Sequence, residues 1–310
     1  RAAGPDVNPR LVGMLAAEIR RYRPDVVHTH LVHADVSGQL AAALTRVPGV
    51  SSVHGAPAFY RREPYRSLGR AVGRLAARRI AISESVARFV SELRLAPPER
   101  VRVIHYGVDV AKWTATESDR RRARASFELA EDEVVVGIAA RLIAGKGHAA
   151  LIESFARATA NLPRLRLLVA GEGPARRSLE SLAEQLCPRD SVRFLGFTTD
   201  VASVFAASDL LVFPTLPELS EGFGLAPLEA MATARPVIVS AVGSLPEVVD
   251  DVGIVVPAAS VEALSAAIVN LASDAALRHR LGSRSAARAR DVFGLETMVS
   301  RTVALYEEIA

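Results

Sequence analysis

The sequence predicts an α/β protein with two parallel, doubly wound sheets, and three observations carry this prediction. Short β-branched or apolar runs alternate along the chain with longer Ala-, Leu- and Arg-rich segments of helical period. The apolar runs are continuous, as in strands that are buried on both faces. The 310 residues, half of them hydrophobic and 23% charged, suggest two domains of roughly 100–200 residues each. This composition excludes a disordered chain and a disulfide-stapled mini-protein.

Ten of the apolar runs are expected to form strands, with amphipathic helices between most of them. The first part of the chain has four such runs and starts with a helix over 9–21, whereas the second part has six. The predicted strands are 26–29, 50–53, 80–83, 101–104, 134–139, 165–170, 192–195, 210–213, 237–240 and 253–256. Two Rossmann-like halves follow from this pattern, and ligands of such sheets bind outside the carboxyl ends of the strands.

The boundary between the halves is expected within 106–118, where a polar stretch follows the strand at 101–104 and precedes a new series from Glu133. We therefore predict an N-terminal domain over 1–112, a C-terminal domain over 113–292 and a final helical segment over 293–310. The single cysteine, Cys187, can form neither an internal disulfide nor a metal cluster, which favours a reducing compartment. No apolar run approaches the roughly 18 residues of a membrane span, and residues 1–6 lack the apolar region of a signal peptide. A soluble, cytoplasmic protein is expected.

Basic residues are concentrated in the first part of the chain. Residues 1–114 have a charge balance of +9 and residues 115–310 one of −5. Arg66, Arg70, Arg74 and Arg78 recur at every fourth position and would form a stripe on one helix. The stripe fits peripheral contact with an anionic membrane, or a solvated helix face in a chain with 36 Arg and two Lys. Aromatic residues make up only 5% of the chain, which disfavours nucleic-acid binding.

The segment after the strand at 210–213 has the richest chemistry. Gly222 and Gly224 allow a tight turn and close approach of a ligand, and Pro227 suits the first turn of a helix. The amides of residues 224–227 would point at an anion. Glu221 and Glu229, on either side, could accept hydrogen bonds from sugar hydroxyls. The alternative is an ordinary helix start with acidic residues and a glycine turn.

A second segment follows the strand at 134–139. Arg141 and Lys146 could reach the edge of the sheet, and Gly145 and Gly147 keep the loop slim. A lysine between glycines is a compact charge suited to phosphate, although the P-loop pattern is absent. The alternative is a pair of ordinary surface cations. The Gly-x-Gly turn at 171–173 lacks a third glycine and does not indicate a nicotinamide site.

Histidines follow two strands of the first part. His54 comes directly after the strand at 50–53, where a lone histidine is more often structural. His28 and His30 are weaker candidates. The spread of His28, His30 and His33 suggests zinc, but no fourth ligand is near in the sequence. No metal is therefore expected.

These segments, in this order, resemble glycosyltransferase family 4, the retaining nucleotide-sugar enzymes of the GT-B fold, over about 23–292. The matching motifs are Glu-x7-Glu at Glu221 and Glu229, Arg…Gly-Lys-Gly at Arg141 and Lys146, Gly-x-Gly-Pro at 171–174, Leu-Gly at 195–196, and Gly-Gly-x-Pro-Glu at 243–247 with Ser244 in place of a glycine. The resemblance implies two Rossmann-like domains facing a cleft. It also implies that the final segment packs back on the first domain, and that about two β-α units are missing at the start of that domain.

The resemblance also implies roles for individual residues. Arg141 and Lys146 would grip the donor diphosphate, and Glu229 would hold the ribose hydroxyls. Glu221 would bind the transferred sugar, and His54 would face the reaction centre. The remaining donor contacts implied are Gly222, Phe223, Gly224, Leu225, Gly171, Gly196, Phe197 and Thr198. Neither metal nor cofactor is expected, because no Asp-x-Asp occurs and cations already supply positive charge.

The expected activity is metal-independent, retaining transfer of a sugar. The donor would be a UDP- or GDP-sugar, and the acceptor a hydroxyl of a glycan or of a lipid-linked precursor. Such a protein would be cytoplasmic, with peripheral contact at the inner face of the plasma membrane. The alternatives are a non-catalytic nucleotide-sugar-binding module and a nucleotide-sugar epimerase of the same two-domain shape.

Overall fold

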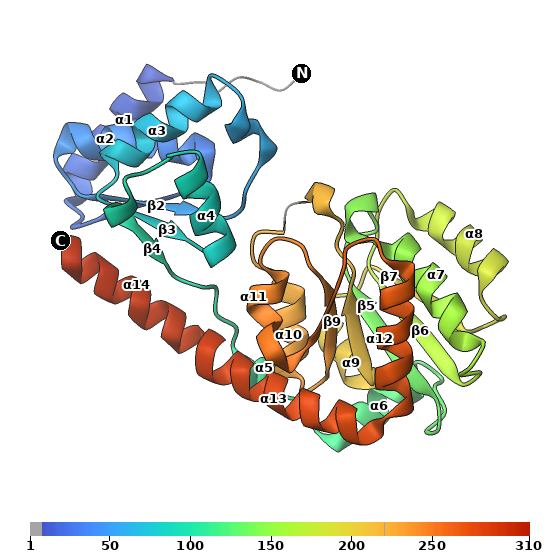
Figure 1. Ribbon diagram of the computed structural model, residues 1–310. Helices are drawn as coiled ribbons and strands as arrows, with labels where there is room; N and C mark the ends of the chain where they lie inside the picture. Colours follow the sequence, from blue (N-terminus) through green and yellow to red (C-terminus); the bar gives the residue numbers. More distant parts are fainter. Residues whose placement is uncertain (1–7, 220) are drawn as a thin grey trace. The chain divides into compact units, whose positions relative to one another are not determined.

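The computed structural model describes residues 8–219 and 221–310, which form two compact units (Figure 1). Unit 1 comprises residues up to Gly107 together with Glu296–Ala310, and unit 2 comprises Val108–Leu295. The predicted boundaries were 112/113 and 292/293. The signal-peptide prediction for residues 1–6 and the position of Ser220 lie outside the described residues.

Unit 1 has a four-stranded parallel sheet in sequential order. Its strands are β1 (Val27–His30), β2 (Gly49–Val53), β3 (Arg78–Ala81) and β4 (Val101–Val103). Its helices are α1 (Pro9–Tyr22), α2 (Val32–Thr45), α3 (Tyr65–Leu75), α4 (Glu84–Glu92) and, after unit 2, nearly all of α14 (Leu295–Ile309). On α14, Leu305 is buried against Val50, Ile80 and Ile104 of the sheet region. Burying these apolar groups stabilises the unit.

Unit 2 has a six-stranded parallel sheet in the order β10-β9-β8-β5-β6-β7. Its strands are β5 (Val134–Ala139), β6 (Leu165–Ala170), β7 (Val192–Gly196), β8 (Leu210–Phe213), β9 (Val237–Ser240) and β10 (Ile254–Val256). Its helices are α5 (Val110–Trp113), α6 (Glu117–Ser126), α7 (His148–Thr159), α8 (Arg176–Leu186), α9 (Val201–Ala207), α10 (Leu225–Ala232), α11 (Leu245–Val249), α12 (Val261–Ser273) and α13 (Ala275–Phe293). The first strand of this unit, β5, lies in the middle of the sheet. The strands β6 and β7 are added on one side of β5, and β8, β9 and β10 on the other, which is the doubly wound order.

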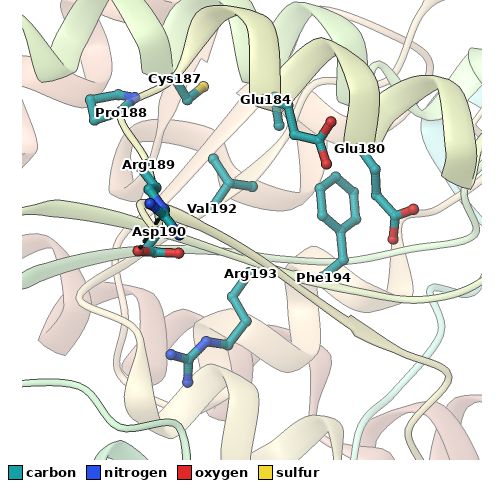
Figure 2. A pocket seen from close by; sticks show the side chains of 10 residues that line it. Glu180, Glu184, Cys187, Pro188, Arg189, Asp190, Val192, Arg193 and Phe194 are labelled. Atoms are coloured by element: carbon teal, nitrogen blue, oxygen red, sulfur yellow. Dashed lines mark ion pairs between the residues drawn. The ribbon is translucent and has the colours of Figure 1, made fainter.

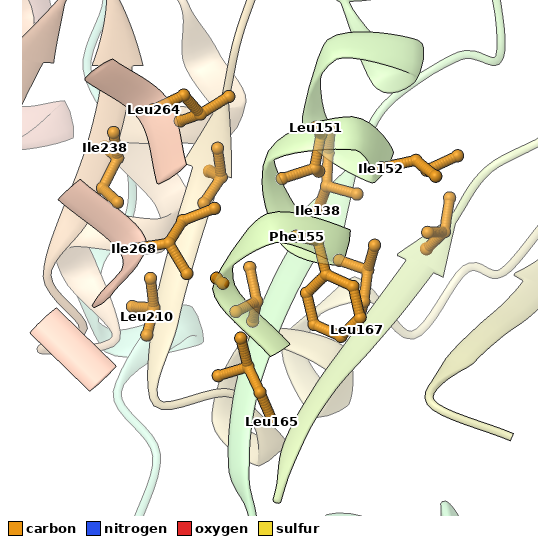
Figure 3. Close-up of a cluster of buried hydrophobic side chains, with 14 of the residues drawn as sticks. Ile138, Leu151, Ile152, Phe155, Leu165, Leu167, Leu210, Ile238, Leu264 and Ile268 are labelled. Carbon is orange, nitrogen blue, oxygen red and sulfur yellow. The ribbon is translucent and has the colours of Figure 1, made fainter. Parts of the chain in front are cut away.

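The main core of unit 2 lies between the sheet and the helices α7 and α12 (Figure 3). Phe155 of α7 and Ile268 of α12 are fully buried over Leu167 and Leu210 of the strands. A second cluster, which includes Ala123 of α6 and residues of α9, covers the other face. Both faces of the strands are therefore buried, which is why their sequences are continuous apolar runs.

All ten predicted strands are present in the described residues, and their ends differ from the prediction by at most two residues. The largest shift is in β3, which begins at Arg78 although 80–83 was expected. Arg79 is fully buried inside this strand, where it donates to the Gly69 and Leu95 carbonyls and pairs with Asp35 at 3.5 Å. A buried, paired arginine is rare enough that patterning alone places the strand start too late.

The predicted stripe of four arginines on one helix is wrong. Helix α3 ends at Leu75, and Arg78 lies in β3, where it pairs with Glu308 and donates to the Ala77 carbonyl at 2.9 Å. The spacing of four continues past the helix only because the chain passes through Ala76 into a strand. Arg66, Arg70 and Arg74 remain on α3.

No helix within residues 8–219 and 221–310 is both long and apolar enough to cross a membrane.

Candidate functional site

A pocket of about 220 Å³ lies at the carboxyl ends of β5 and β8, where the strand order of unit 2 reverses. Such switch points are where ligands of doubly wound sheets bind. The pocket is lined by Ile138, Ala139, Ala140, Arg141, Lys146, Phe213, Thr215, Glu221, Gly224, Leu225, Ala226 and Pro227. Segments far apart in the sequence, including the two richest ones, therefore meet in a single pocket.

Two glycines place the lysine loop at the pocket. Gly147 has φ +73°, and a Cβ there would lie 1.9 Å from the Pro214 carbonyl oxygen, so only glycine fits. Leu216 N donates to the Gly145 carbonyl at 2.8 Å and fixes the loop from the other side. Lys146 Nζ then donates to Glu221 Oε2 at 2.6 Å, with the two side chains 22% and 19% exposed. Partial burial makes this ion pair stronger than a solvated one.

The backbone of Glu221 is held by the neighbouring loop before α11. Ser244 N donates to the Glu221 carbonyl at 3.2 Å. Gly243 has φ +57°, and a Cβ there would lie 2.0 Å from the same carbonyl oxygen. The Thr215 hydroxyl reaches Glu221 Oε2 at 3.4 Å. The carboxylate is therefore positioned by contacts from both sides.

Helix α10 begins directly at the pocket. Gly224, its N-cap, has φ +81°, which favours glycine, and Leu225 and Ala226 contribute the first amides. The sequence predicted that the amides of residues 224–227 point at an anion, but Pro227 has no N–H and cannot contribute one. The N-terminal amides and the helix dipole favour an anion at this point. Phe223 is only 3% exposed and packs against Phe293, so only its backbone is available to a ligand.

Glu229 lies one turn into α10 and is half-buried. Burial raises the pKa of its carboxyl group from an ordinary 4.5 to about 7. Glu229 does not line the 220 Å³ pocket itself. Near neutral pH its carboxyl group is therefore poised between two protonation states.

The predicted turn after β6 packs against the edge of the same pocket. A Cβ on Gly171, which has φ +138°, would lie 2.0 Å from the carbonyl oxygen of Ala140, a pocket residue. Gly171 N donates to the Gly196 carbonyl at 2.8 Å. Beyond it, the Phe197 side chain is 77% exposed, and the Thr198 hydroxyl accepts from Asp200 N at 3.0 Å. Gly171 follows β6, Gly196 is the last residue of β7, and Phe197 and Thr198 follow it. None of these residues lines the pocket.

His54 belongs to unit 1, whereas the pocket belongs to unit 2. It follows β2, and its Nε2 lies 3.0 Å from Nδ1 of His30. Its Nδ1 hydrogen-bonds the Tyr106 hydroxyl. Burial and, secondarily, the charge of His30 lower the pKa of His54. The His54 ring is therefore held by two partners, His30 and Tyr106. The sequence analysis considered His30 only a weak candidate for the site and did not identify Tyr106.

Thr215 was also missed by sequence reasoning. It is the second residue after β8, and polar residues just after a strand of a parallel sheet lie at the ligand edge. That position was the available signal. Arg141 was predicted; its side chain lines the pocket, is exposed and has no ion-pair partner within residues 8–219 and 221–310.

A larger hollow of about 780 Å³ lies elsewhere on unit 2, beside α8 and β7 (Figure 2). It includes Cys187, Glu184 and the ion-paired Arg189 and Asp190, and none of the predicted site residues. Burial raises the pKa of the Cys187 thiol to about 11, so it is a poor nucleophile. Although this hollow is the larger of the two, we find no candidate catalytic group among its lining residues.

Comparison with known families gives two matches along the chain. The model of "Glycosyl transferases group 1" matches residues 119–288, and that of "Glycosyltransferase Family 4" matches residues 2–112. The D-inositol 3-phosphate glycosyltransferase of Mycobacterium tuberculosis is 35% identical over 303 residues, covering 91% of this chain and 61% of that protein. The chain thus spans about three fifths of the length of these curated relatives.

Solved structures show the same architecture. Anabaena HepE, crystallised with UDP, has a TM-score of 0.88 at 23% identity, covering 96% of this chain and 82% of that chain. Sucrose-phosphate synthase from Thermosynechococcus elongatus has a TM-score of 0.79 at 26% identity, covering 97% and 77%. The predicted GT-B fold and the predicted family are confirmed. Because the "Glycosyl transferases group 1" model matches more than half of the residues of this chain, the chain belongs to that family.

Proposed function

We propose that this protein is a retaining, metal-independent glycosyltransferase. It would move a sugar from a UDP- or GDP-sugar donor to a hydroxyl of a glycan or lipid-linked acceptor. The observation that carries the proposal is the 2.6 Å contact between Lys146 and Glu221 in a pocket at the switch point of the sheet. A cation for phosphate and a carboxylate for sugar hydroxyls then stand side by side.

In the proposed complex, the donor diphosphate lies between Arg141, Lys146 and the first amides of α10. As the bond between the sugar and the phosphate breaks, negative charge develops on the leaving nucleoside diphosphate, and these groups stabilise it. Two cations and a helix N-terminus supply charge of the kind that Mg²⁺ supplies elsewhere, which supports metal independence. HepE, of the same fold, has been crystallised with UDP-glucose.

Two carboxylates have separate roles in this proposal. Glu221 accepts hydrogen bonds from the transferred sugar, and Glu229 from the ribose. The acceptor hydroxyl attacks the sugar on the face that the diphosphate leaves, and its proton passes to the departing phosphate oxygen. The anomeric configuration is therefore retained without a protein nucleophile. We assign the remaining predicted residues, Gly171, Gly196, Phe197 and Thr198, to the nucleotide side of the donor and His54 to the reaction centre.

The proposal also includes contact with a membrane and a cellular compartment. Arg66, Arg70 and Arg74 of α3 are proposed to contact an anionic membrane, without Arg78, which is paired inside unit 1. A cytoplasmic protein at the inner face of the plasma membrane is proposed on this basis.

Calorimetric titration with UDP, GDP and ADP, with EDTA present, tests the donor site. We expect one diphosphate to bind and Lys146→Ala to weaken it about 10–100-fold, because a hydrogen bond to a charged group contributes about 1.5–3 kcal/mol. Lys112→Ala is the matched control, since the side chain of this other lysine is 78% exposed. Failure of all three diphosphates to bind, or equal loss in both variants, would contradict the proposal.

Glu221→Gln separates an enzyme from a binding module. Release of the nucleoside diphosphate from its matching sugar nucleotide should fall strongly. Diphosphate affinity should stay or rise, because Lys146 loses its competing carboxylate. Unchanged release, or a variant altered only in affinity, would indicate a protein that binds the donor without transferring the sugar.

A further inference from the structure

A second charged hollow lies in unit 1, on residues outside the donor pocket. Its volume is about 380 Å³, within the range of small-ligand pockets, about 300–1,000 Å³. It is lined by Arg70, Arg74, Ser91, Arg94, Ala96, Pro97 and Pro98. Three of these residues are arginines and none is acidic.

Backbone contacts hold the three arginines around this hollow. Arg70 Nε donates to the Leu93 carbonyl at 3.0 Å, which ties α3 to the segment after α4. Arg94, with φ +51°, ends α4 in a left-handed turn in which its N donates to the Ser91 carbonyl at 2.9 Å. Arg100 Nη1 donates to the Arg74 carbonyl at 2.6 Å. The arrangement is therefore built by α3, α4 and the segment that follows α4.

The three guanidinium groups have no counter-charge in the described parts of the chain. Neither Arg70, Arg74 nor Arg94 forms an ion pair with any residue of 8–219 or 221–310. Glu92, next to the lining residue Ser91, pairs with Arg61 at 3.7 Å instead. Like charges around one hollow repel each other, and an anion placed between them removes this repulsion.

We propose that Arg70, Arg74 and Arg94 form a binding site for a phosphate group, separate from the donor pocket. Guanidinium groups bind phosphate through paired N–H donors, and the Ser91 hydroxyl can donate as well. The hollow has space for an organic group attached to the phosphate. The lining residues all lie within 70–98 of unit 1, so the proposal does not rest on the proposed transferase activity.

Arginine modification by phenylglyoxal, read residue by residue by peptide mass spectrometry, tests the site in the full chain. Inorganic phosphate, titrated at constant ionic strength because salt screens charges, should slow modification of Arg74 and Arg94. Arg88 is the matched control, an exposed arginine of α4 outside the hollow. Arg94→Gln should weaken the protection of Arg74 about 10-fold or more, since a charged hydrogen bond is lost. Arg88→Gln should leave it unchanged.

Two sources of the phosphate are distinguished by a second arm with vesicles of phosphatidylcholine with and without phosphatidic acid. Protection by inorganic phosphate assigns the site to a soluble phosphate compound. Protection by phosphatidic acid vesicles alone assigns it to a lipid headgroup. The proposal is overturned if neither protects, or if Arg88 is protected equally. Loss of protection in Lys146→Ala would also overturn it, because the phosphate would then be bound in unit 2.

Discussion

Lys146 and Glu221 are separated by 75 residues in the sequence, and two glycines bring them together. Gly147 allows contact with the Pro214 carbonyl, and Gly243 leaves room for the Glu221 carbonyl. In the free protein each charge is neutralised by the other. A donor diphosphate must therefore compete with Glu221 for Lys146, so a change at Glu221 should alter the affinity of Lys146 for the diphosphate.

At the same scale, Glu229→Gln should change how stability depends on pH. Burial raises the pKa of Glu229 from 4.5 to about 7, so over that interval the native state holds a proton that the unfolded state has released. Stability contributed by this residue therefore falls as the pH rises from 4.5 to about 7. The glutamine variant should have a flatter profile in urea unfolding across this interval.

The control is Glu184→Gln, an exposed residue of α8, which should keep the wild-type profile. A Glu229→Gln protein whose stability still falls as the pH rises would show that another group is responsible. Two histidines, the buried His148 and the half-buried His28, act in the opposite direction. The pKa values of His28 and His148 are lowered by burial from 6.5 to about 4, so their contribution to stability is lost as the pH falls through that interval.

Sequence spacing was sufficient to select Arg141, Lys146 and Glu221, because each stands in a short motif after a strand. Thr215 was not predictable in the same way, since a single hydroxyl has no spacing to identify it. The direction of the Phe223 side chain, into the core, depends on Phe293, 70 positions further along the chain. The motifs therefore identify the backbone that forms the site more reliably than the side chains that fill it.

At the scale of elements, apolar runs predicted the strands of unit 2 well because both faces of that sheet are covered. Helix ends were harder to predict. The spacing of the arginines from Arg66 to Arg78 runs across the junction of α3 and β3, and only the tertiary structure ends the helix at Leu75. The shape of a loop that depends on close backbone contacts, such as the loop of Gly147, can be predicted neither from sequence periodicity nor from charge.

Gly147→Ala tests the importance of one such loop. A Cβ would lie 1.9 Å from the Pro214 carbonyl oxygen in a left-handed conformation, so we expect a loss of about 1–3 kcal/mol or more in the free energy of unfolding. Diphosphate affinity should fall with it, because Lys146 is displaced. Urea unfolding and calorimetry provide the two measurements.

Gly13→Ala is the matched control for this substitution. Gly13 lies inside α1, and a Cβ there would meet nothing within 4 Å. Alanine is favoured over glycine in a helix, so this variant should gain about 0.5–1 kcal/mol. If both alanine variants behave alike, the close contact at Gly147 does not hold the lysine loop.

At the scale of the whole molecule, the pocket is built entirely within Val108–Leu295. The number of strands could be predicted from the sequence. Their order could not, because it depends on which way each crossover turns. The chain passes between the units after Gly107 and after Leu295, and these two points are tied together where Leu295 N donates to the Val108 carbonyl at 3.0 Å.

A fragment of residues 108–295 should therefore bind the nucleoside diphosphate as tightly as the full chain. It contains the whole six-stranded sheet, both of its apolar clusters and every pocket residue. Circular dichroism would establish that the fragment folds, and calorimetry would compare the affinities. Much weaker binding by a folded fragment would mean that unit 1 supplies part of the diphosphate site.

The place of Leu305 in the first unit has a consequence for the order in which the protein matures on the ribosome. Val50, Ile80 and Ile104 are synthesised early, yet the Leu305 side chain that covers them comes more than 200 residues after each of them. All of the second unit emerges in between and can fold first. The nascent first unit must keep an uncovered apolar face throughout this time, which is the situation in which chaperones bind growing chains.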